Sequence, residues 1–317
     1  MRIAIMGSGG VGGYAGGWLQ QAGHELSFIA RGEHLQALRR DGLRIEHPEL
    51  PLHLPRVQAT DDLASVGPVD LVIFAVKLFD TDSAAQAMAP LVGPGTRVLT
   101  LQNGIDSVAM IRRHVDPAAQ VLAGVIYVSA VIERPGVIRS PGGLHAIVAD
   151  RAGGDAVMAE LERSSAGLAG LSVKLSDEAT QTVWEKFVAL ASLAGATALL
   201  RARMGAILAH PETRAFQRQL IDEAIAVAQA RGVALRSGLA DEIMTKLAGM
   251  PAAFRSSMAE DLERSNRLEL RWLSGRVHGL GIELGLPTPA HTAVYRGLVL
   301  FEGGRSVASD PGFQTQP

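Results

Sequence analysis

Short apolar runs alternate with segments of helical length through the first half of the chain. Gly, Pro, Asp or Asn bound each run, and the runs are Arg2–Met6, Glu25–Ala30, Val69–Val76, Arg97–Leu101 and Val121–Val128. Continuous apolar runs are typical of strands buried on both faces, as in a parallel sheet. The segments between them predict helices over Val11–Ala22, His34–Arg40, Thr81–Leu91 and Ile105–His114. This alternation predicts an α/β fold with a doubly wound sheet. Pro48, Pro51 and Pro55 predict an irregular stretch after Ile45.

The second half of the chain carries long helical patterns and few strand signals. Glycines separate the patterns, which predict helices over Glu178–Leu200, Pro211–Arg231, Gly238–Ala248, Ser257–Gly279 and Thr288–Phe301. One short strand candidate, Leu171–Leu175, precedes them. We therefore expect an α/β domain over residues 1–176 and an all-helical domain over residues 177–317.

A glycine-rich loop follows the first predicted strand. Its residues match G-x-G-x-x-G and open a helix, which is the context that dinucleotide binding requires. The first glycine permits a tight turn, the second lets a pyrophosphate approach the backbone, and the third lets helix and strand pack closely. The helix N-terminus offers free N–H groups to an anion. The loop therefore predicts that a dinucleotide cofactor is bound by Gly7, Ser8, Gly9, Gly10, Val11 and Gly12. The alternative is a glycine-rich turn that binds no ligand.

The second predicted strand ends in Arg31, where NAD-binding versions of this motif carry an acidic residue. A carboxylate accepts a hydrogen bond from a ribose 2′-hydroxyl and repels a 2′-phosphate. A guanidinium does the reverse, with a full charge and a bidentate fork. Arg31 therefore predicts NADP(H) in preference to NAD(H), and the alternative is a solvated surface arginine.

Two further predicted strands end in polar side chains. Lys77 follows Val72–Val76, and Asn103 follows Leu99–Gln102. In open α/β sheets, ligands bind outside the carboxyl ends of the strands. We therefore expect Lys77 to contact the phosphate or ribose of the cofactor, and Asn103 to contact the nicotinamide ribose, the substrate, or both.

Composition narrows the function classes. The formal net charge is −2, which argues against a nucleic-acid binder. Cysteine is absent, so the chain has neither disulfides nor a thiolate nucleophile, and the nine histidines form no metal motif. The longest uncharged apolar stretch, Phe187–Leu200, is shorter than the roughly 20 residues that span a bilayer. We expect a cytoplasmic protein without a membrane or metal site.

An ordered set of motifs resembles the ketopantoate reductase (2-dehydropantoate 2-reductase) family, from Met1 to about Phe301. Besides the glycine loop, the set comprises Ala30-Arg31-Gly32-Glu33-His34, Val76-Lys77, Gln102-Asn103-Gly104, Trp184-Glu185-Lys186, Ser256-Ser257-Met258 and Glu269. The resemblance implies a Rossmann-type domain followed by an all-helical domain like the C-terminal domain of 6-phosphogluconate dehydrogenase. It implies NADPH-dependent reduction of a 2-oxo acid to a 2-hydroxy acid in pantothenate biosynthesis, and such domains often form homodimers.

The resemblance also implies roles for single residues. The catalytic lysine of the family matches Lys186 and its active-site glutamate matches Glu269. Its substrate-contacting serine matches Ser257, while Asn103 and Lys186 also contact substrate. Its cofactor contacts match Lys77, Asn103 and, by a loose alignment, Ala130. Burial near the start of an apolar helix lowers the pKa of a lysine, which makes Lys186 a better general acid. Glu269 is expected in the middle of a helix.

The chain departs from the family where substrate is expected. Three asparagines of the ketopantoate reductases are replaced by Leu190, Ala194 and Met204. An apolar site favours apolar substrates, so a less polar 2-oxo acid or ketone is an alternative to 2-dehydropantoate. A second alternative is that other side chains rebuild the polar contacts, with Ser192, Arg201 and Arg203 as candidates. A 3-hydroxyacid-type dehydrogenase and a non-catalytic NADP(H)-binding redox sensor are further alternatives.

Overall fold

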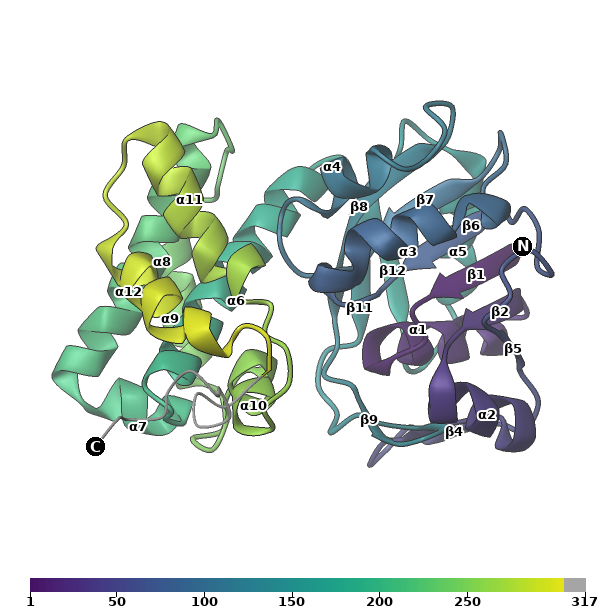
Figure 1. Ribbon diagram of the computed structural model, residues 1–317, viewed down its shortest axis with the longest axis horizontal. Helices are drawn as coiled ribbons and strands as arrows, with labels where there is room; N and C mark the ends of the chain where they lie inside the picture. The colour runs from purple at the N-terminus through teal and green to yellow at the C-terminus, as the bar shows by residue number, and fades with distance from the viewer. Residues whose placement is uncertain (305–317) are drawn as a thin grey trace, which may run out of the picture. The chain divides into compact units, whose positions relative to one another are not determined.

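The computed structural model describes residues 1–304, which form two compact units (Figure 1). Unit 1 comprises Met1–Val183 and unit 2 begins at Trp184. Each unit has its own packed core and is described by itself.

An eight-stranded sheet is the centre of unit 1. Its order is β12-β11-β8-β7-β6-β1-β2-β5. Neighbours from β2 to β8 pair in parallel, as the sequence predicted, and β5, which it did not predict, adds in parallel beside β2. In contrast, β11 pairs antiparallel with β8 and parallel with β12. The strands are β1 (Arg2–Met6), β2 (Glu25–Ile29), β5 (Gln58–Thr60), β6 (Leu71–Phe74), β7 (Arg97–Thr100), β8 (Gln120–Tyr127), β11 (Ala146–Asp150) and β12 (Ser172–Ser176).

Successive residues of these strands enter two apolar layers, one on each face of the sheet. In β1, Ile3 and Ile5 belong to one layer and Ala4 and Met6 to the other, and all four are buried. The first layer includes side chains of α1 (Gly10–Gln21), α2 (Gly32–Asp41) and α5 (Ala156–Ser165). The second includes side chains of α3 (Thr81–Ala87), α4 (Ser107–Arg112) and the short turn η2 (Ala89–Leu91) (Figure 1 labels α3 and α4). The short turn η1 (Leu78–Asp80) directly precedes α3. A sheet covered on both faces explains the continuous apolar runs.

A second sheet, of four strands, was not predicted. Its order is β4-β3-β10-β9, formed by β3 (Leu43–Glu46), β4 (Leu52–Leu54), β9 (Val131–Arg134) and β10 (Val137–Arg139). The stretch after Ile45, with Pro48, Pro51 and Pro55, was expected to be irregular, and this is wrong for β4. The prolines lie between and after β3 and β4, so they interrupt no ladder.

Unit 2 is helical, as predicted. Its helices are α6 (Ala179–Leu199, whose first residues belong to unit 1), α7 (Met204–Ala209), α8 (Pro211–Ala230), α9 (Leu239–Ala248), α10 (Ser257–Glu263), α11 (Ser274–Leu284) and α12 (Pro289–Leu298), with turns η3 (Leu270–Trp272) and η4 (Val299–Phe301). Among residues 1–304, none of these or the other helices has the length and apolar content to cross a bilayer.

The single helix expected over Ser257–Gly279 is wrong. The chain leaves α10 through Ser265, whose φ of +54° is left-handed. The Ser265 amide donates to the Leu262 carbonyl (3.2 Å) and the Asn266 amide to the Asp261 carbonyl (2.8 Å). These bonds are those of a Schellman motif, which ends a helix. Glu269 therefore lies between two helices, at the start of η3, and not in the middle of a helix.

Candidate functional site

The predicted cofactor residues lie at one edge of the sheet of unit 1. Met6, Ile29, Phe74 and Thr100 are register partners at the carboxyl ends of β1, β2, β6 and β7. Each strand end is followed within three residues by one of the predicted positions, which are the glycine loop, Arg31, Lys77 and Asn103. The structure thus brings together four segments that are far apart in the sequence.

The glycine loop has the geometry that its sequence predicted. Gly7 has a φ of +95°, a left-handed conformation that a side chain rarely adopts. A Cβ atom on Gly12 would lie 2.2 Å from the Gly7 carbonyl oxygen, so helix α1 approaches β1 as closely as glycine allows. A Cβ on Gly10 would lie 2.2 Å from the Ala130 carbonyl oxygen. Ala130 therefore lies beside the first turn of α1.

The loop has room for a pyrophosphate at Gly9. A Cβ built on Gly9 meets no atom within 4 Å in the described chain. Gly9 is also the N-cap of α1, and no described side chain caps this helix end. Backbone N–H groups at an uncapped helix N-terminus are suited to an anion. These residues fit the phosphates of a nicotinamide dinucleotide.

Ser8 and His34 hold the loop in place. Ser8 is buried, and its amide donates to the Ile29 carbonyl at 3.0 Å. The His34 Nε2 donates to the Ser8 carbonyl at 2.9 Å, and the Gly136 amide donates to the His34 Nδ1 at 3.2 Å. Burial lowers the pKa of His34, so the ring is neutral and can serve as donor and acceptor at once. His34 ends the motif Ala30-Arg31-Gly32-Glu33-His34, but nothing in the sequence indicated this role.

Arg31 lies just after β2 and extends into solvent. Its side chain is 88% exposed, and its guanidinium Nη2 lies 3.1 Å from the Asp80 carboxylate. Asp80 ends the turn η1 that follows β6. The arginine expected to bind a 2′-phosphate is thus already paired with an acidic partner that the sequence analysis did not identify.

A buried glutamine ties the ends of β6 and β7 together. The Gln102 Nε2 donates to the Val76 carbonyl (3.0 Å) and to the Thr81 hydroxyl (2.8 Å). Val76 directly precedes Lys77, which is exposed, and Gln102 directly precedes Asn103, which is half-buried. Gln102 therefore fixes the backbone from which both predicted contacts project. Its place in the motif Gln102-Asn103-Gly104 was the available signal.

In unit 2, Lys186 lies on helix α6. Burial lowers the pKa of Lys186 to about 8, and the negative charge of Glu269 acts in the opposite direction. Glu269 itself is only 8% exposed. The structure therefore places the two predicted catalytic residues within electrostatic reach of each other, although they are far apart in the sequence.

The two adjacent serines have different surroundings. Ser256 is buried, and its hydroxyl caps α10 by accepting from the Ala259 amide (3.1 Å). It also shares a hydrogen bond with the Thr197 hydroxyl of α6 (2.8 Å). Ser257 is exposed. This arrangement leaves Ser257, the predicted substrate contact, accessible to a ligand.

The three positions that replace the family asparagines carry apolar side chains that are partly or fully buried. Leu190 lies four residues and Ala194 eight residues beyond Lys186, so Lys186, Leu190 and Ala194 share one face of α6. Leu190 is half-buried, whereas Ala194 and Met204 are each 1% exposed. The candidates for rebuilt polar contacts differ. Ser192 is buried and donates to the Val188 carbonyl of its own helix (2.8 Å), whereas Arg201 and Arg203 are exposed.

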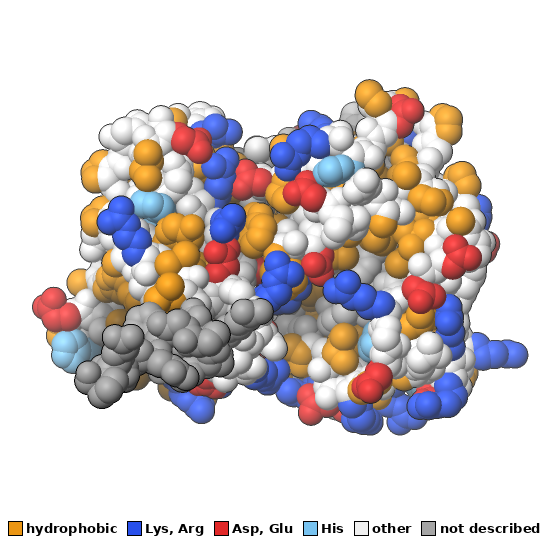
Figure 2. Space-filling model, viewed as in Figure 1, with side chains coloured by type: hydrophobic (Ala, Val, Ile, Leu, Met, Phe, Trp, Pro, Cys, Tyr) orange, Lys and Arg blue, Asp and Glu red, His pale blue; other side chains and the backbone are white. Residues whose placement is uncertain are grey.

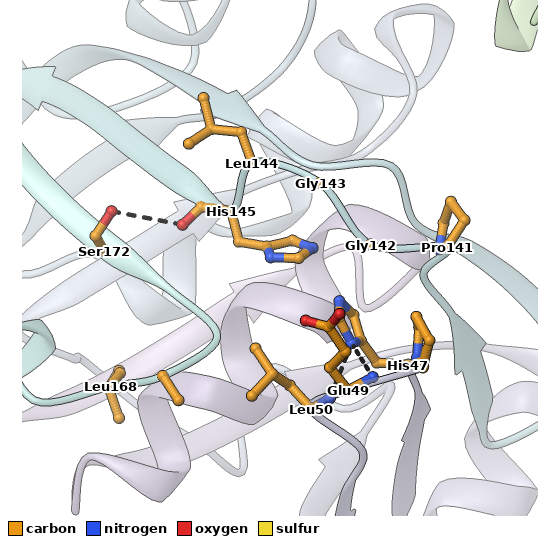
Figure 3. A pocket seen from close by; sticks show the side chains of 12 residues that line it. His47, Glu49, Leu50, Pro141, Gly142, Gly143, Leu144, His145, Leu168 and Ser172 are labelled. Atoms are coloured by element: carbon orange, nitrogen blue, oxygen red, sulfur yellow. Dashed lines mark hydrogen bonds between the residues drawn. The ribbon is translucent and has the colours of Figure 1, made fainter. Parts of the chain in front are cut away.

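Unit 1 has a separate pocket of about 390 Å³ that contains none of the predicted site residues. Figure 3 shows His145 above the Glu49 carboxylate in this view, with His47 beside it. The Nδ1 of His47 accepts from the Glu49 and Leu50 amides at 3.1 and 2.9 Å. Burial and the neighbouring His47 lower the pKa of His145.

Charged side chains of both signs are interspersed over the face shown in Figure 2. Within residues 1–304, no group of three or more His, Asp or Glu side chains is arranged to hold a metal ion.

Comparison with known proteins identifies the family. Residues 3–152 match the model of ketopantoate reductase PanE/ApbA, and residues 178–301 match that of its C-terminal domain. The 2-dehydropantoate 2-reductase of Halobacterium salinarum is 32% identical over 280 residues, which cover 87% of this chain and 91% of the relative. That of Mesorhizobium japonicum is 30% identical over 315 residues, 93% of this chain and 95% of the relative.

A solved structure agrees. The PanE/ApbA family ketopantoate reductase from Ralstonia eutropha superposes with a TM-score of 0.88 at 35% identity, covering 95% of this chain and 98% of the other. Members of this family use a nicotinamide cofactor, which is the group that the loop at Gly9 fits. The chain therefore belongs to the ketopantoate reductase family and is an oxidoreductase.

Proposed function

We propose that the chain catalyses NADPH-dependent reduction of a 2-oxo acid to a 2-hydroxy acid, with 2-dehydropantoate as the first candidate substrate. The observation that carries this proposal is Lys186, whose pKa is lowered to about 8 beside the buried Glu269. An ammonium with such a pKa remains protonated at neutral pH and gives up its proton more readily than an ordinary lysine.

The proposed chemistry divides between the units. Unit 1 holds the cofactor through the glycine loop, Arg31 and Lys77, and Asn103 orients the nicotinamide ribose or the substrate. When bound, the reduced nicotinamide supplies a hydride to the carbonyl carbon. Lys186 donates a proton to the carbonyl oxygen as negative charge develops there. The reaction balances as 2-oxo acid, NADPH and a proton giving 2-hydroxy acid and NADP⁺.

The test of the catalytic assignment is Lys186→Ala. We expect kcat to fall by about 10²–10⁴, the usual contribution of an acid–base group. The matched control is Lys246→Ala, which removes an exposed lysine of the same unit that pairs with Glu242. Fluorescence titration should give the same NADPH Kd for Lys186→Ala and the unmodified protein. A fall in kcat of less than about tenfold would contradict the assignment.

A less polar 2-oxo acid is the second candidate substrate, and the apolar face of α6 favours it. Phenylglyoxylate, a 2-oxo acid with an apolar ring, serves as the comparison substrate. We expect Leu190→Asn to raise kcat/KM for 2-dehydropantoate relative to phenylglyoxylate, because the introduced amide can form a hydrogen bond with a substrate hydroxyl. Leu190→Met, which keeps the site apolar, is the control. A panel of 2-oxo acids with the unmodified protein then decides between the candidates. Tight NADPH binding without turnover of any carbonyl would instead support the redox sensor.

Reduction of 2-dehydropantoate would place the enzyme in pantothenate biosynthesis, a cytoplasmic pathway. We also propose a homodimer, since unit 2 carries large exposed apolar side chains, Ile282 and Leu300, each 69% exposed. Light scattering on the purified protein tests the dimer, and a monomeric mass at micromolar concentration would exclude it.

A further inference from the structure

We propose that Asp80 sets the cofactor preference of the enzyme by competing with the cofactor 2′-phosphate for Arg31. This inference rests on the proposed binding of NADPH in unit 1. It adds a specificity-determining residue to that site, and this residue weakens the selectivity that Arg31 provides.

The contact is direct and lies where the 2′-phosphate is expected. The Arg31 Nη2 donates to the Asp80 Oδ2 at 3.1 Å. Arg31 follows β2 and Asp80 follows β6, two strands that both pair with β1. The Asp80 amide donates to the Lys77 carbonyl at 2.9 Å and closes the turn that also carries Lys77. The carboxylate is therefore held at the same sheet edge as both predicted phosphate-binding cations.

The exposed fractions show which partner can move. The Arg31 side chain is 88% exposed, whereas that of Asp80 is 27% exposed. The carboxylate is thus the better-held partner and the guanidinium the more mobile one. Asp80 is also the N-cap of α3, yet its side chain makes no capping hydrogen bond to this helix. Replacing the carboxylate should therefore leave α3 intact.

Electrostatics gives the direction of the effect. A guanidinium binds a phosphate best through a bidentate fork, and Asp80 occupies one of its nitrogens. A phosphate monoester carries a charge between about −1 and −2 near neutral pH, so it is also repelled by a neighbouring carboxylate. NADH brings only a neutral hydroxyl to this position. Asp80 should therefore weaken NADPH binding and affect NADH binding little.

The experiment measures Kd for NADPH and for NADH by cofactor fluorescence at low salt, without substrate. For Asp80→Asn we expect the Kd for NADPH to fall about two- to fivefold, the range for an exposed charge interaction, and the Kd for NADH to change by less than about twofold. The fall should shrink as salt is added, because salt screens exposed charges. Asp80→Glu retains the charge and should keep the original ratio within about twofold.

The matched control is Asp82→Asn, which removes a carboxylate two residues further on that pairs with His114 and Arg113. A rise in the Kd for NADPH in Asp80→Asn would show that Asp80 orients Arg31 for the phosphate and would overturn the proposal. An unchanged ratio of the Kd for NADPH to the Kd for NADH in Asp80→Asn would overturn the proposal as well. So would an equal change of this ratio in Asp82→Asn. If the unmodified protein binds neither dinucleotide, the proposed function fails together with this inference.

Discussion

At the scale of single residues, the pKa of Lys186 determines how activity depends on pH. The protonated amine is the form that can donate a proton, and its pKa is lowered to about 8. For reduction, kcat/KM should therefore be constant below this pH and fall above it, since kcat/KM reports the groups of the free enzyme. A pH profile from 6 to 11 measures this descending limb of the curve. A limb near the ordinary lysine value of about 10.4 would contradict the inferred burial of the amine.

Glu269 should move this limb in a known direction. Its negative charge favours the protonated amine, so Glu269→Gln should lower the pKa of Lys186 and shift the limb to lower pH. A role in folding alone would reduce the amount of active enzyme without moving the limb. Glu263→Gln is the control, because Glu263 is an exposed carboxylate of unit 2 that pairs with Arg255. A limb that stays in place, or moves upward, would contradict the proposed coupling.

The sequence predicted the geometry best for residues whose role depends on contacts close by in the sequence. Gly7 and Gly12 were assigned from a six-residue pattern, and their φ angle and close contacts agree with it. The partner of Arg31 was not predictable, because Asp80 approaches only when β2 and β6 pair with the same strand. For the same reason, the role of Ser256 as a helix cap bonded to Thr197 of α6 was not predictable, although the resemblance singled out the neighbouring Ser257.

At the scale of elements, the break after α10 shows the limit of helical periodicity. Leu268, Leu270 and Leu273 continue an apolar pattern that is typical of a helix, and all three are buried. The helix nevertheless ends, at Ser265, by a motif in which glycine is the usual left-handed residue. A serine in that position gives no signal in the sequence. The consequence for the site is that Glu269 is presented by a connection and not by a helix face.

A buried carboxylate joins two helices of unit 2. Glu223 of α8 is 8% exposed and accepts from the Ala290 and His291 amides at the start of α12, at 2.8 and 3.0 Å. These are N–H groups that no carbonyl within a helix can satisfy. We expect Glu223→Ala to lower the free energy of unfolding by about 3 kcal/mol, because it removes charge-assisted bonds and leaves buried donors unpaired. Urea unfolding followed by circular dichroism measures the loss.

The neighbouring Asp222 provides the matched control. It lies on the same helix but pairs with Arg218 at the surface, at 2.9 Å. Because exposed helix pairs contribute about 0.3–0.5 kcal/mol, Asp222→Asn should change the free energy of unfolding by no more than this. Equal losses of unfolding free energy in the two variants would show that the bonds from Glu223 to the start of α12 contribute no more than a surface ion pair.

At the scale of the whole molecule, the sequence predicted two kinds of architecture but not every strand pairing. The parallel strands from β5 to β8 belong to βα units, whose order along the chain almost determines their pairing. The pairing of β3 with β10, and the antiparallel entry of β11, join segments far apart in the sequence. The strands of the second sheet are only three or four residues long and leave little periodic signal, so this sheet was missed.

Cofactor binding also links the site to the stability of the protein as a whole. A ligand that binds only the folded state stabilises it by RT ln(1 + [L]/Kd), which is about 2.7 kcal/mol at 100 times Kd. At equal concentrations, NADPH should therefore raise the Tm more than NADH does, by a few degrees for a tenfold difference in Kd. Arg31→Ala should abolish this difference. Arg40→Ala, which removes an exposed arginine of α2 paired with Asp41, should preserve it. Equal shifts by the two cofactors in the unmodified protein would show that Arg31 does not select NADPH.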